Sequence, residues 1–510
     1  MRDVLGLEAY KKNGFISIDD DHESVSKTLE YAYDDWCIAQ MAQILNKQED
    51  YQYFMKRSQN WKNLFDWETG YLRPKKNGGW EKPFDPREVN NNFTEGNAWQ
   101  YSFFVPQDIQ GMIKAYGGKE KFEAKLDEMF NSESKTTGRE QVDVTGLIGQ
   151  YAHGNEPSHH MAYLYNYVGK PEKTNEKVKY ILDNFYTNTP DGLIGNEDCG
   201  QMSAWYVLSA IGIYSVTPGT TKWQTTYPYF EKVKFNFEKE IIKDIYPSIL
   251  KTELENIGDF YDDSVIKSNV YTYENITPVP VIEAENKSFK EELPIQFKTW
   301  NKSAKVYYSI NQSPFMLYQN PFSIKESAII RFYSDEGVGK KSDTISAQFF
   351  KKPNPYSINI KSVYNPQYHA GGSEGLIDGI YGSENWRKGE WQGYQNQDFE
   401  AIIDLQKETS ISGISSNFLQ DTRAWILMPT QIEFYVSNDN ESFKKLATVL
   451  NKINAKDYAV QIQKLTAKVS ANGRYIKVIA KNFGKLPEWH QGFPYKGDAF
   501  IFIDEIEIKN

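Results

Sequence analysis

Three segments in the N-terminal half combine acidic, amide and imidazole side chains in patterns that could support chemistry. They are NNNFTEGNAWQY at 90–101, GQYAHGNEPSHH at 149–160 and DGLIGNEDCGQMSAW at 191–205. Their carboxylates lie among glycine, asparagine and proline residues, which are typical of loops. Two carboxylates on separate loops are what glycoside hydrolysis needs, because one protonates the leaving oxygen while the other attacks or activates water. A glycosidase is therefore one hypothesis from these residues alone.

Ordinary structural roles explain the same residues equally well. Thr94 could cap a helix with Glu95 in its first turn, and Glu197 with Asp198 could form an acidic helix start, since carboxylates stabilise the positive end of a helix dipole. Pro157 indicates the first residue of another helix, whose neighbouring histidines would then cap and pack. On the residues alone, both interpretations of Glu95 stay open.

The histidines do not have the spacing of a helical zinc motif. His153 and His159 are six positions apart and His160 directly follows His159, whereas the motif pairs residues i and i+4. Oxygen donors dominate these segments instead, and such donors suit calcium, a hard cation. The sequence contains no EF-hand loop, glycine-rich phosphate loop or serine nucleophile elbow.

Composition excludes several classes of protein. The 510 residues carry a formal net charge of −10, which argues against a general nucleic-acid binder. Hydrophobic residues make up 40%, and no run of them approaches the ~18 residues of a membrane-spanning helix. Aromatic residues reach 15%, which suits β-rich domains and sugar sites, although packing explains most of these rings. Cys37 and Cys199 are too few for a disulfide framework or a four-cysteine zinc site.

The periodicity of the chain predicts an α part followed by a β part. Apolar residues recur at helical spacing between Gly, Pro, Asn and Asp, and the predicted helices are 24–45, 49–65, 94–104, 106–116, 119–130, 157–168, 171–187 and 199–214. A polar stretch at 68–92 predicts a long loop. From about residue 216 the segments become short, β-branched and aromatic, which is typical of strands.

The polar segments, in this order, resemble glycoside hydrolase family 92, whose members are calcium-dependent exo-acting α-mannosidases of bacteria. The matching stretches are TEGNAWQYSFFVP at 94–106, GQYAHGNEPSHH at 149–160 and GNEDCGQMSAWY at 195–206, and SVSKTLEYAYDDW at 24–36 is similar too. The resemblance covers residues 1–238. It implies an (α/α)₆ toroid that removes terminal mannose from N-glycans or mannan, with inversion at the anomeric carbon.

Carried over motif by motif, the resemblance implies roles for individual residues. Glu95 matches the general acid and Asp198 the general base, with Glu197 as its partner. Calcium would hold the O2 and O3 hydroxyls of mannose, and the metal positions are Asn155, Glu156 and Asp198. The implied substrate contacts are Arg139, Glu140, His153 and Trp99. Arg139 leaves the linkage open, with α-1,2 favoured.

The resemblance also leads us to expect an incomplete catalytic domain. The family's toroid requires more helices than residues 1–238 supply, and its N-terminal β-sandwich does not precede them. We therefore expect an exposed apolar edge, poor solubility or activity of the chain alone, and the missing N-terminal part of the enzyme as a partner beside α-mannose-containing glycans. The alternative is a non-catalytic glycan-binding protein that carries a truncated hydrolase domain. The start of the sequence is not a signal peptide, although the family implies a periplasmic, cell-surface or secreted bacterial location.

Two β-rich segments are expected beyond a connecting segment at 239–278. Residues 279–352, with SAKVYYSINQSPF and AIIRFYSDEG, resemble the Ig-like domain of chitobiase-type hexosaminidases. Residues 358–510, with GLIDG, WRKGEWQGY and FIDEIEI, resemble discoidin-like coagulation factor type C domains close to family 32 carbohydrate-binding modules. The predicted fold is therefore multidomain α plus β: a partial (α/α)₆ toroid, an Ig-like sandwich and a discoidin-like jelly roll.

The discoidin resemblance implies a ligand site formed by loops at one end of the jelly roll. The candidate sugar-stacking residues are Trp386, Trp391, Tyr394 and Trp489, and a structural calcium is expected near Asp378. Packing inside the sandwich is an equally strong interpretation of Trp386 and Trp391.

Overall fold

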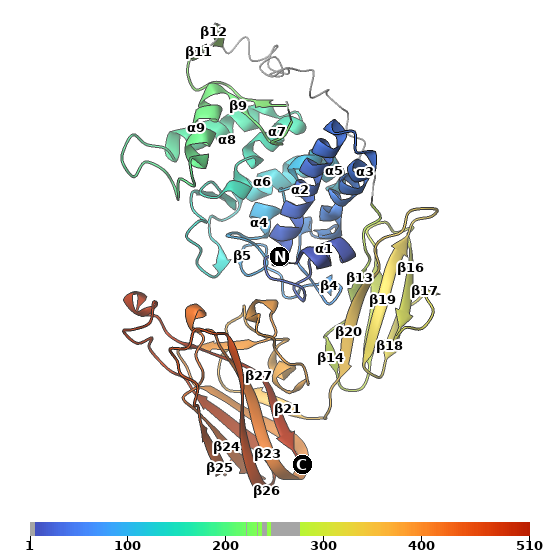
Figure 1. Cartoon of the computed structure of the whole chain (residues 1–510), viewed down its shortest axis with the longest axis vertical. Coiled ribbons are helices and arrows are strands. Elements are labelled where there is room, and N and C mark those ends of the chain that lie inside the picture. The colour runs from blue at the N-terminus through green and yellow to red at the C-terminus, as the bar shows by residue number, and fades with distance from the viewer. Residues whose placement is uncertain (1–5, 221, 232, 237–241, 246–275) are drawn as a thin grey trace.

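The structure, a computed structural model, describes residues 6–220, 222–231, 233–236, 242–245 and 276–510. These residues form a helical part, a middle β-sandwich and a C-terminal β-sandwich (Figure 1). The predicted combination of a helical region with sheet-rich C-terminal regions is confirmed. The connecting segment predicted at 239–278 lies mostly outside the described residues.

The helical part contains helices of very different length. They are α1 (Leu7–Asn13), α2 (Ser24–Ile44), α3 (Gln48–Arg57), α4 (Ala98–Tyr101), α5 (Ile109–Ala115), α6 (Lys119–Asn131), α7 (Leu164–Tyr167), α8 (Pro171–Asn184) and α9 (Gln201–Ile211). The predictions at 24–45, 119–130 and 171–187 agree closely with α2, α6 and α8. The predictions at 94–104 and 157–168 are too long, because the first forms only α4 and the second breaks into two 3₁₀ turns and α7.

Helix α2 has one buried apolar face and a second apolar group at the surface. Val25, Leu29 and Trp36 recur at helical spacing on its buried face and are at most 1% exposed. A second apolar group on the same helix lies at the surface, with Met41 55% and Ile44 46% exposed. The apolar edge expected of the helical part is therefore present on α2.

Short strands pair within the long loops of the helical part and after its last helix. Antiparallel pairs join β1 (Phe65–Asp66) to β2 (Tyr71–Leu72), β3 (Lys75–Lys76) to β4 (Gly79–Trp80), and β7 (Leu147–Ile148) to β8 (Tyr151–Ala152). Farther along the chain, β9 (Ile213–Tyr214) pairs with β10 (Gln224–Thr225) and β11 (Val233–Asn236) with β12 (Ile242–Ile245). The parallel pair of β5 (Glu88–Val89) and β6 (Thr137–Gly138) holds Arg139 beside the segment that leads to Glu95.

The middle sandwich packs a three-stranded sheet against a five-stranded one. The first has the order β13 (Val281–Glu283), β15 (Leu293–Lys298), β18 (Phe322–Ile324). The second has the order β14 (Ser288–Phe289), β20 (Ile345–Lys351), β19 (Ala328–Asp335), β16 (Lys305–Ile310), β17 (Met316–Leu317). Buried and exposed residues alternate along β15 and β20, as expected of strands with one buried face. The buried residues of this sandwich belong to the same hydrophobic cluster as those of the helical part.

The C-terminal sandwich is built on two very long strands. Its strands are β21 (Ser357–Ile360), β22 (Gln392–Gln395), β23 (Phe399–Gln420), β24 (Gln431–Ser437), β25 (Lys444–Leu450), β26 (Gln461–Lys481) and β27 (Phe500–Lys509). They are ordered β22-β27-β23-β26-β24-β25, with β21 paired to β23. Irregular register between β23 and β26, at Asp404/Thr409 and Ile411/Gly413, lets the strands bend around a separate core.

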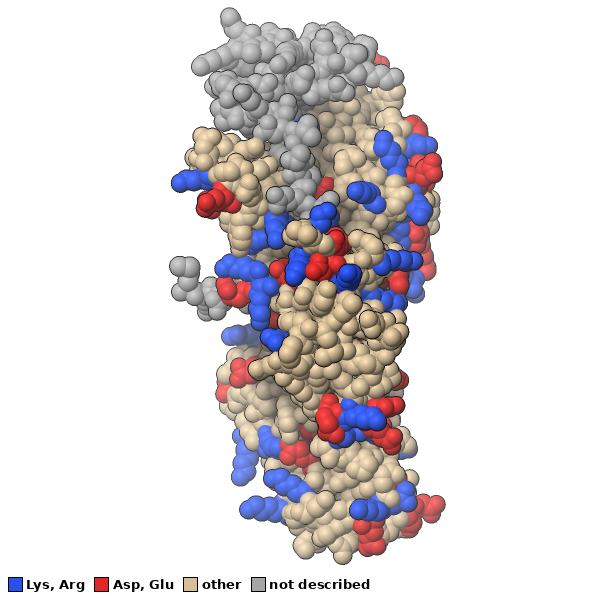
Figure 2. All heavy atoms as spheres, turned by 90° about the vertical axis from the view of Figure 1, so that its right-hand side faces the viewer, with Lys and Arg blue, Asp and Glu red and all other residues tan. Residues whose placement is uncertain are grey.

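Charges are mixed on the visible surface. The face in Figure 2 shows basic and acidic side chains side by side, separated by broad uncharged areas. Within the part of the chain that the structure describes, no helix combines the length and apolar character needed to span a bilayer.

Candidate active site

Glu95 lies on a tight loop directly before α4. Its φ of 49° is in the left-handed region, where a residue with a side chain is strained. The helix is capped by Asn97, whose side chain accepts from Trp99 N at 3.0 Å, while Asn97 N donates to Gln100 Oε1 at 2.8 Å. The prediction that Thr94 caps the helix is therefore wrong, and the Glu95 side chain is exposed beside it.

The adjacent residues Glu197 and Asp198 have different surroundings. Glu197 accepts hydrogen bonds from Ser203 N at 3.2 Å and Ser203 Oγ at 3.0 Å, so its carboxylate is bound to the first turn of α9. Asp198 is exposed, with a φ of 50°. The helix-start interpretation fits Glu197, whereas the side chain of Asp198 interacts with that of Glu156.

Several charged residues affect the pKa of Glu95. Burial raises the pKa of Glu95, the negative charges of Asp143, Asp198 and Glu23 raise it further, and the positive charge of Arg139 opposes them. Such effects weaken with distance, so these side chains surround one site. A raised pKa keeps a carboxylic acid protonated, as a general acid requires. Nothing in the sequence pattern marks Glu23 or Asp143 as members of this site.

Asn155 and Glu156 join the loops of the site. Asn155 Nδ2 donates to Glu95 O at 2.8 Å, and Asn155 Oδ1 accepts from Glu156 N at 3.1 Å. Burial raises the pKa of Glu156, and the like charge of Asp198 contributes to the same shift. Two neighbouring carboxylates and an amide oxygen are donors that fit a hard cation such as Ca²⁺. Among the described residues, no three His, Cys, Asp or Glu side chains converge on one metal position.

Glycines allow these loops to approach closely. A Cβ on Gly154 would lie 2.0 Å from Thr145 Oγ1, and one on Gly195 would lie 2.8 Å from the same atom. Gly154 N donates to Thr145 O at 3.1 Å, and Asn196 Nδ2 donates to Asp143 Oδ1 at 2.9 Å. The segments carrying Asp143, Glu156 and Asp198 are thus packed together by contacts that only glycine permits.

The three histidines of the second segment are structural. His153 is 0% exposed, and its ring nitrogens lie 2.7 Å from the hydroxyls of Tyr151 and Tyr186. Burial lowers its pKa to about 2, so the ring is neutral. His159 bonds to His153 O at 2.9 Å and His160 to Phe103 O at 2.8 Å. His153 offers no surface to a substrate, which corrects the substrate contact implied for it.

The other implied substrate contacts differ in exposure. Trp99 is 3% exposed and packs edge-on against Tyr71 at 4.9 Å, so it is a core residue rather than a substrate contact. Glu140 is exposed. Arg139 is half-buried, and its Nη1 donates to Asn91 Oδ1 at 3.5 Å.

The sugar-stacking candidates of the C-terminal sandwich are mostly buried. Trp391 and Tyr394 are 0% exposed, and Trp386 is 8% exposed with Nε1 donating to Asp421 Oδ2 at 3.0 Å. These rings have no free face for a sugar, which corrects their implied role in favour of packing. Exposed rings instead occur in the loop before β27, where Trp489 is half-buried, Phe493 is 45% exposed and Tyr495 is 78% exposed. Sequence reasoning found Trp489 but missed the other two.

A second acidic group lies inside the C-terminal sandwich. Burial raises the pKa of Asp378 and of Asp504 to about 6, and that of Glu505 to about 9. Gly382 N donates to Asp504 Oδ2 at 2.7 Å, and Gly379 N donates to Glu505 Oε2 at 3.1 Å. These contacts fix the loop after Asp378, where the structural calcium is expected, and that calcium stays a prediction.

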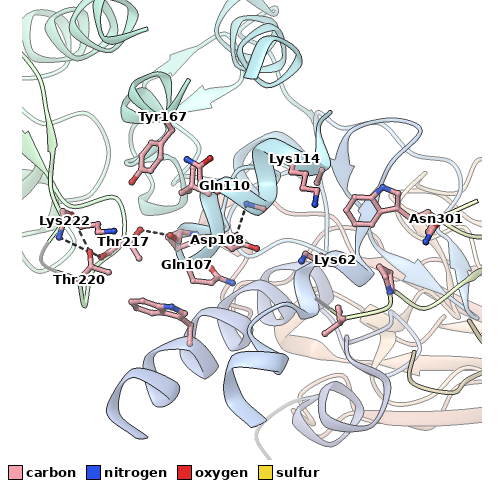
Figure 3. Close-up of a pocket in the computed structure, with 18 of the residues that line it drawn as sticks. Lys62, Gln107, Asp108, Gln110, Lys114, Tyr167, Thr217, Thr220, Lys222 and Asn301 are labelled. Atoms are coloured by element: carbon pink, nitrogen blue, oxygen red, sulfur yellow. Dashed lines mark hydrogen bonds between the residues drawn. The ribbon is translucent and has the colours of Figure 1, made fainter. Parts of the chain in front are cut away.

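One pocket in the described part of the chain lies away from these carboxylates. It has a volume of about 860 Å³ and is lined by Trp36 of α2, residues 106–111, Tyr167 and Trp300, among others. Figure 3 shows Gln107, Asp108 and Lys114 around it. None of the predicted site residues lines this pocket, so the candidate site is the surface formed by the acidic loops.

Family comparisons agree with two of the three resemblances, those of the first and last segments of the chain. Residues 2–249 match the glycosyl hydrolase family 92 catalytic domain, and residues 358–495 match the F5/8 type C domain. An uncharacterized secreted glycosidase of Arthroderma benhamiae is 28% identical over 260 residues, which are 45% of this chain and 31% of that protein.

Solved structures resemble the two ends of the chain. A family GH92 α-mannosidase from Bacteroides thetaiotaomicron, in complex with mannoimidazole, is 42% identical with a TM-score of 0.46, covering 48% of this chain and 33% of that one. A CBM32 domain from Clostridium perfringens, in complex with GalNAc-β-1,3-galactose, is 17% identical with a TM-score of 0.21, covering 30% and 95%. The chain spans about a third of the length of the glycosidases that it matches. Residues 2–249 are therefore similar to glycosyl hydrolase family 92, and residues 358–495 are similar to the F5/8 type C domains.

Proposed function

We propose that the chain is a calcium-dependent, inverting exo-α-mannosidase that acts on terminal mannose of glycans. One observation carries the proposal: Glu95 has a raised pKa and lies within electrostatic reach of Asp198, on a separate loop. The raised pKa favours the protonated form of Glu95, and a second carboxylate on a separate loop completes the pair that glycoside hydrolysis uses. The match of residues 2–249 to family 92 supports mannose as the sugar.

The proposed mechanism assigns one proton transfer to each carboxylate. Glu95, whose raised pKa favours its protonated form, donates a proton to the glycosidic oxygen as the bond to the anomeric carbon breaks. Asp198 accepts a proton from a water molecule that attacks the opposite face of the sugar. An inverting site requires the two groups to be about 6.5–9.5 Å apart, so that this water fits between them. Glu197 instead holds the start of α9, and thereby the position of the Asp198 loop.

We further propose that Ca²⁺ binds between the loops of Asn155, Glu156 and Asp198. When bound, it would orient sugar hydroxyls and stabilise charge that develops at the ring. Asn155 holds the Glu95 loop through its amide nitrogen while one lone pair of Oδ1 stays available to the cation. A cation would also offset the repulsion that raises the pKa of Glu156 beside Asp198.

Hydrolysis of α-linked mannobioses by the full chain, followed by proton NMR, tests the proposal. We expect β-mannose as the first product, and loss of release in the presence of a calcium chelator. Glu95→Gln should reduce turnover of mannobioses far more than turnover of activated aryl mannosides, whose leaving groups need no proton. Glu120→Gln, at an exposed position of α6, is the control and should leave the turnover of both substrates unchanged. Equal losses of both substrates in Glu95→Gln would contradict the acid assignment.

A glycan-binding function without catalysis is the second candidate. The exposed rings Phe493 and Tyr495, next to Trp489, favour it, because sugars bind to such rings by stacking. Lys456 Nζ lies 5.6 Å from the centroid of the Trp489 ring, so a polar group borders this group of rings. Titration with mannan would then show binding that Tyr495→Ala abolishes, without any mannose release.

We also propose the division predicted from sequence, with domains at 1–238, 279–352 and 358–510, the middle one being Ig-like. Export from the cell is proposed because the Arthroderma relative is described as secreted. The sequence leaves the linkage open, with α-1,2 favoured. Limited proteolysis tests the domain division, and hydrolysis of linkage-defined mannobioses tests the linkage preference.

A further inference from the structure

The C-terminal sandwich contacts the helical part beside the candidate active site. Its loops at one end face the helical part in Figure 1. Gln367 Nε2 donates to Val89 O at 2.6 Å, and Lys76 Nζ donates to Gly389 O at 3.2 Å. Val89 O also accepts from Arg139 N at 3.0 Å. One carbonyl of β5 therefore joins a loop of the C-terminal sandwich to the arginine of the active-site loop.

Tyr368 extends this contact to the side chains of the site. Its ring is held inside the C-terminal sandwich by Phe502, at a centroid distance of 4.9 Å. Its hydroxyl interacts with the Asn91 side chain and with the positive charge of Arg139. Asn91 Oδ1 in turn accepts from Arg139 Nη1 at 3.5 Å. Residues from two parts of the chain thus form one polar group.

The guanidinium of Arg139 is not fully satisfied within this group. Its Nε is buried and finds no hydrogen-bond partner among the described residues. A buried donor without a partner is destabilising, whereas a hydroxyl of a bound ligand would satisfy it. The charge of the same guanidinium acts on Glu95, so a ligand bound at Arg139 would lie within electrostatic reach of the proposed proton donor.

We propose that Tyr368 of the C-terminal sandwich, together with Asn91 and Arg139, binds the sugar on the leaving-group side of the scissile bond. The inference rests on the proposed mannosidase function and assigns part of its specificity to a distant segment of the chain. Hydroxyl, amide and guanidinium groups supply both donors and acceptors, which match the hydroxyls of a neutral sugar residue. Tyr368 is a specificity residue and takes no part in proton transfer.

Affinity measurements with two ligands test this role. Binding of an α-linked mannobiose and of methyl α-mannoside is measured by calorimetry in a Glu95→Gln background, which prevents turnover. Tyr368→Phe removes the hydroxyl and keeps the ring; we expect about three- to tenfold weaker binding of mannobiose, the range of one lost hydrogen bond. Methyl α-mannoside lacks the second sugar, so its affinity should stay unchanged. Tyr435→Phe is the control, because it removes a hydroxyl bond to Glu433 of 2.8 Å on β24 of the same sandwich.

A second variant tests the same role even if Tyr368→Phe fails to fold. Asn91→Ala, on the helical part, should cause the same ligand-selective loss, and the double variant should lose less than the sum of both, since the groups interact. Equal effects on both ligands, or no effect on mannobiose, overturn the inference. Binding of both ligands without hydrolysis by the unmodified chain would refute the proposed function, while the affinity ratio would still decide the role of Tyr368. Absence of any binding would overturn both.

Discussion

The chain holds acidic side chains in two contrasting settings. In the helical part, Glu95 and Asp198 are exposed on strained loops, with φ values of 49° and 50°. In the C-terminal sandwich, Asp378, Asp504 and Glu505 are buried in a regular fold and accept hydrogen bonds from nearby backbone N–H groups. Strain and exposure suit groups that exchange protons with a substrate, whereas burial with fixed donors suits groups that hold a loop. The following substitutions and conditions test this contrast between the two settings.

The largest effect is expected at Asp198. Asp198→Asn removes the proposed base and should reduce mannobiose hydrolysis by about 10²–10⁴-fold. Glu197→Gln is the matched control one residue away; because Glu197 binds α9, it should lower the melting temperature and retain most activity. Steady-state kinetics and thermal melts of both variants measure this. A similar loss of activity in both would contradict the separation of their roles.

The second prediction concerns the calcium dependence of hydrolysis and the proposed ligand Glu156. Glu156→Gln should raise the calcium concentration needed for half-maximal hydrolysis, since it removes one of the proposed carboxylate ligands. Activity is measured against free Ca²⁺ in a buffered series, with Mg²⁺ as the comparison ion. Glu120→Gln, at an exposed position of α6 with no assigned role, provides a control of the same chemistry. An unchanged calcium dependence in Glu156→Gln would contradict the assignment.

The buried group should control stability rather than activity. Its folded pKa values, about 6 for Asp378 and Asp504 and about 9 for Glu505, lie above the unfolded values near 4. The folded state therefore binds more protons, so this contribution is fully present below about pH 4 and is lost as the pH rises towards 9. With chelator present, the melting temperature of the C-terminal sandwich should fall over this range, and Glu505→Gln should flatten its upper part. A melting temperature that rises with pH would contradict this assignment.

The smallest effect concerns the strain itself. Cys199 follows Asp198 with a φ of 55° and has an exposed side chain. Cys199→Gly relieves the left-handed backbone at some cost in chain entropy, so we expect a net gain of less than about 1 kcal/mol in unfolding free energy. Chemical denaturation measures the change, with Cys37→Ala on α2 as a control for removal of a thiol. A loss of more than that amount would mean that the loop is held in place by the cysteine side chain.

The same contrast explains what the sequence could predict. Helices α2, α6 and α8 follow clear apolar periodicity and were predicted with small errors at their ends. Glu95 and Asp198 could be singled out because polar motifs surround them. Asn97 as the cap of α4, and the broken helix around His159, could not, because side-chain bonds to other loops override local helix propensity there.

Contacts between distant parts of the chain were also beyond prediction. Packing and ligand stacking were equally strong interpretations of Trp386 and Trp391, and only the burial of both rings decides between these roles. Tyr368 carries no motif at all, and its nearness to Arg139 depends on how the C-terminal sandwich packs against the helical part. Periodicity records neighbours along the chain, whereas these roles depend on neighbours in space.

The middle sandwich is joined to both of its neighbours. Asn77 exchanges two hydrogen bonds with the backbone of Gln348, at 2.8 and 2.7 Å, on the side of the helical part. Lys290 forms an ion pair of 2.9 Å with Glu374 on the side of the C-terminal sandwich. Removal of the middle sandwich would therefore leave Asn77 and Glu374 without these partners on both sides. The sandwich thus acts as a spacer that fixes the distance and orientation between its two neighbours.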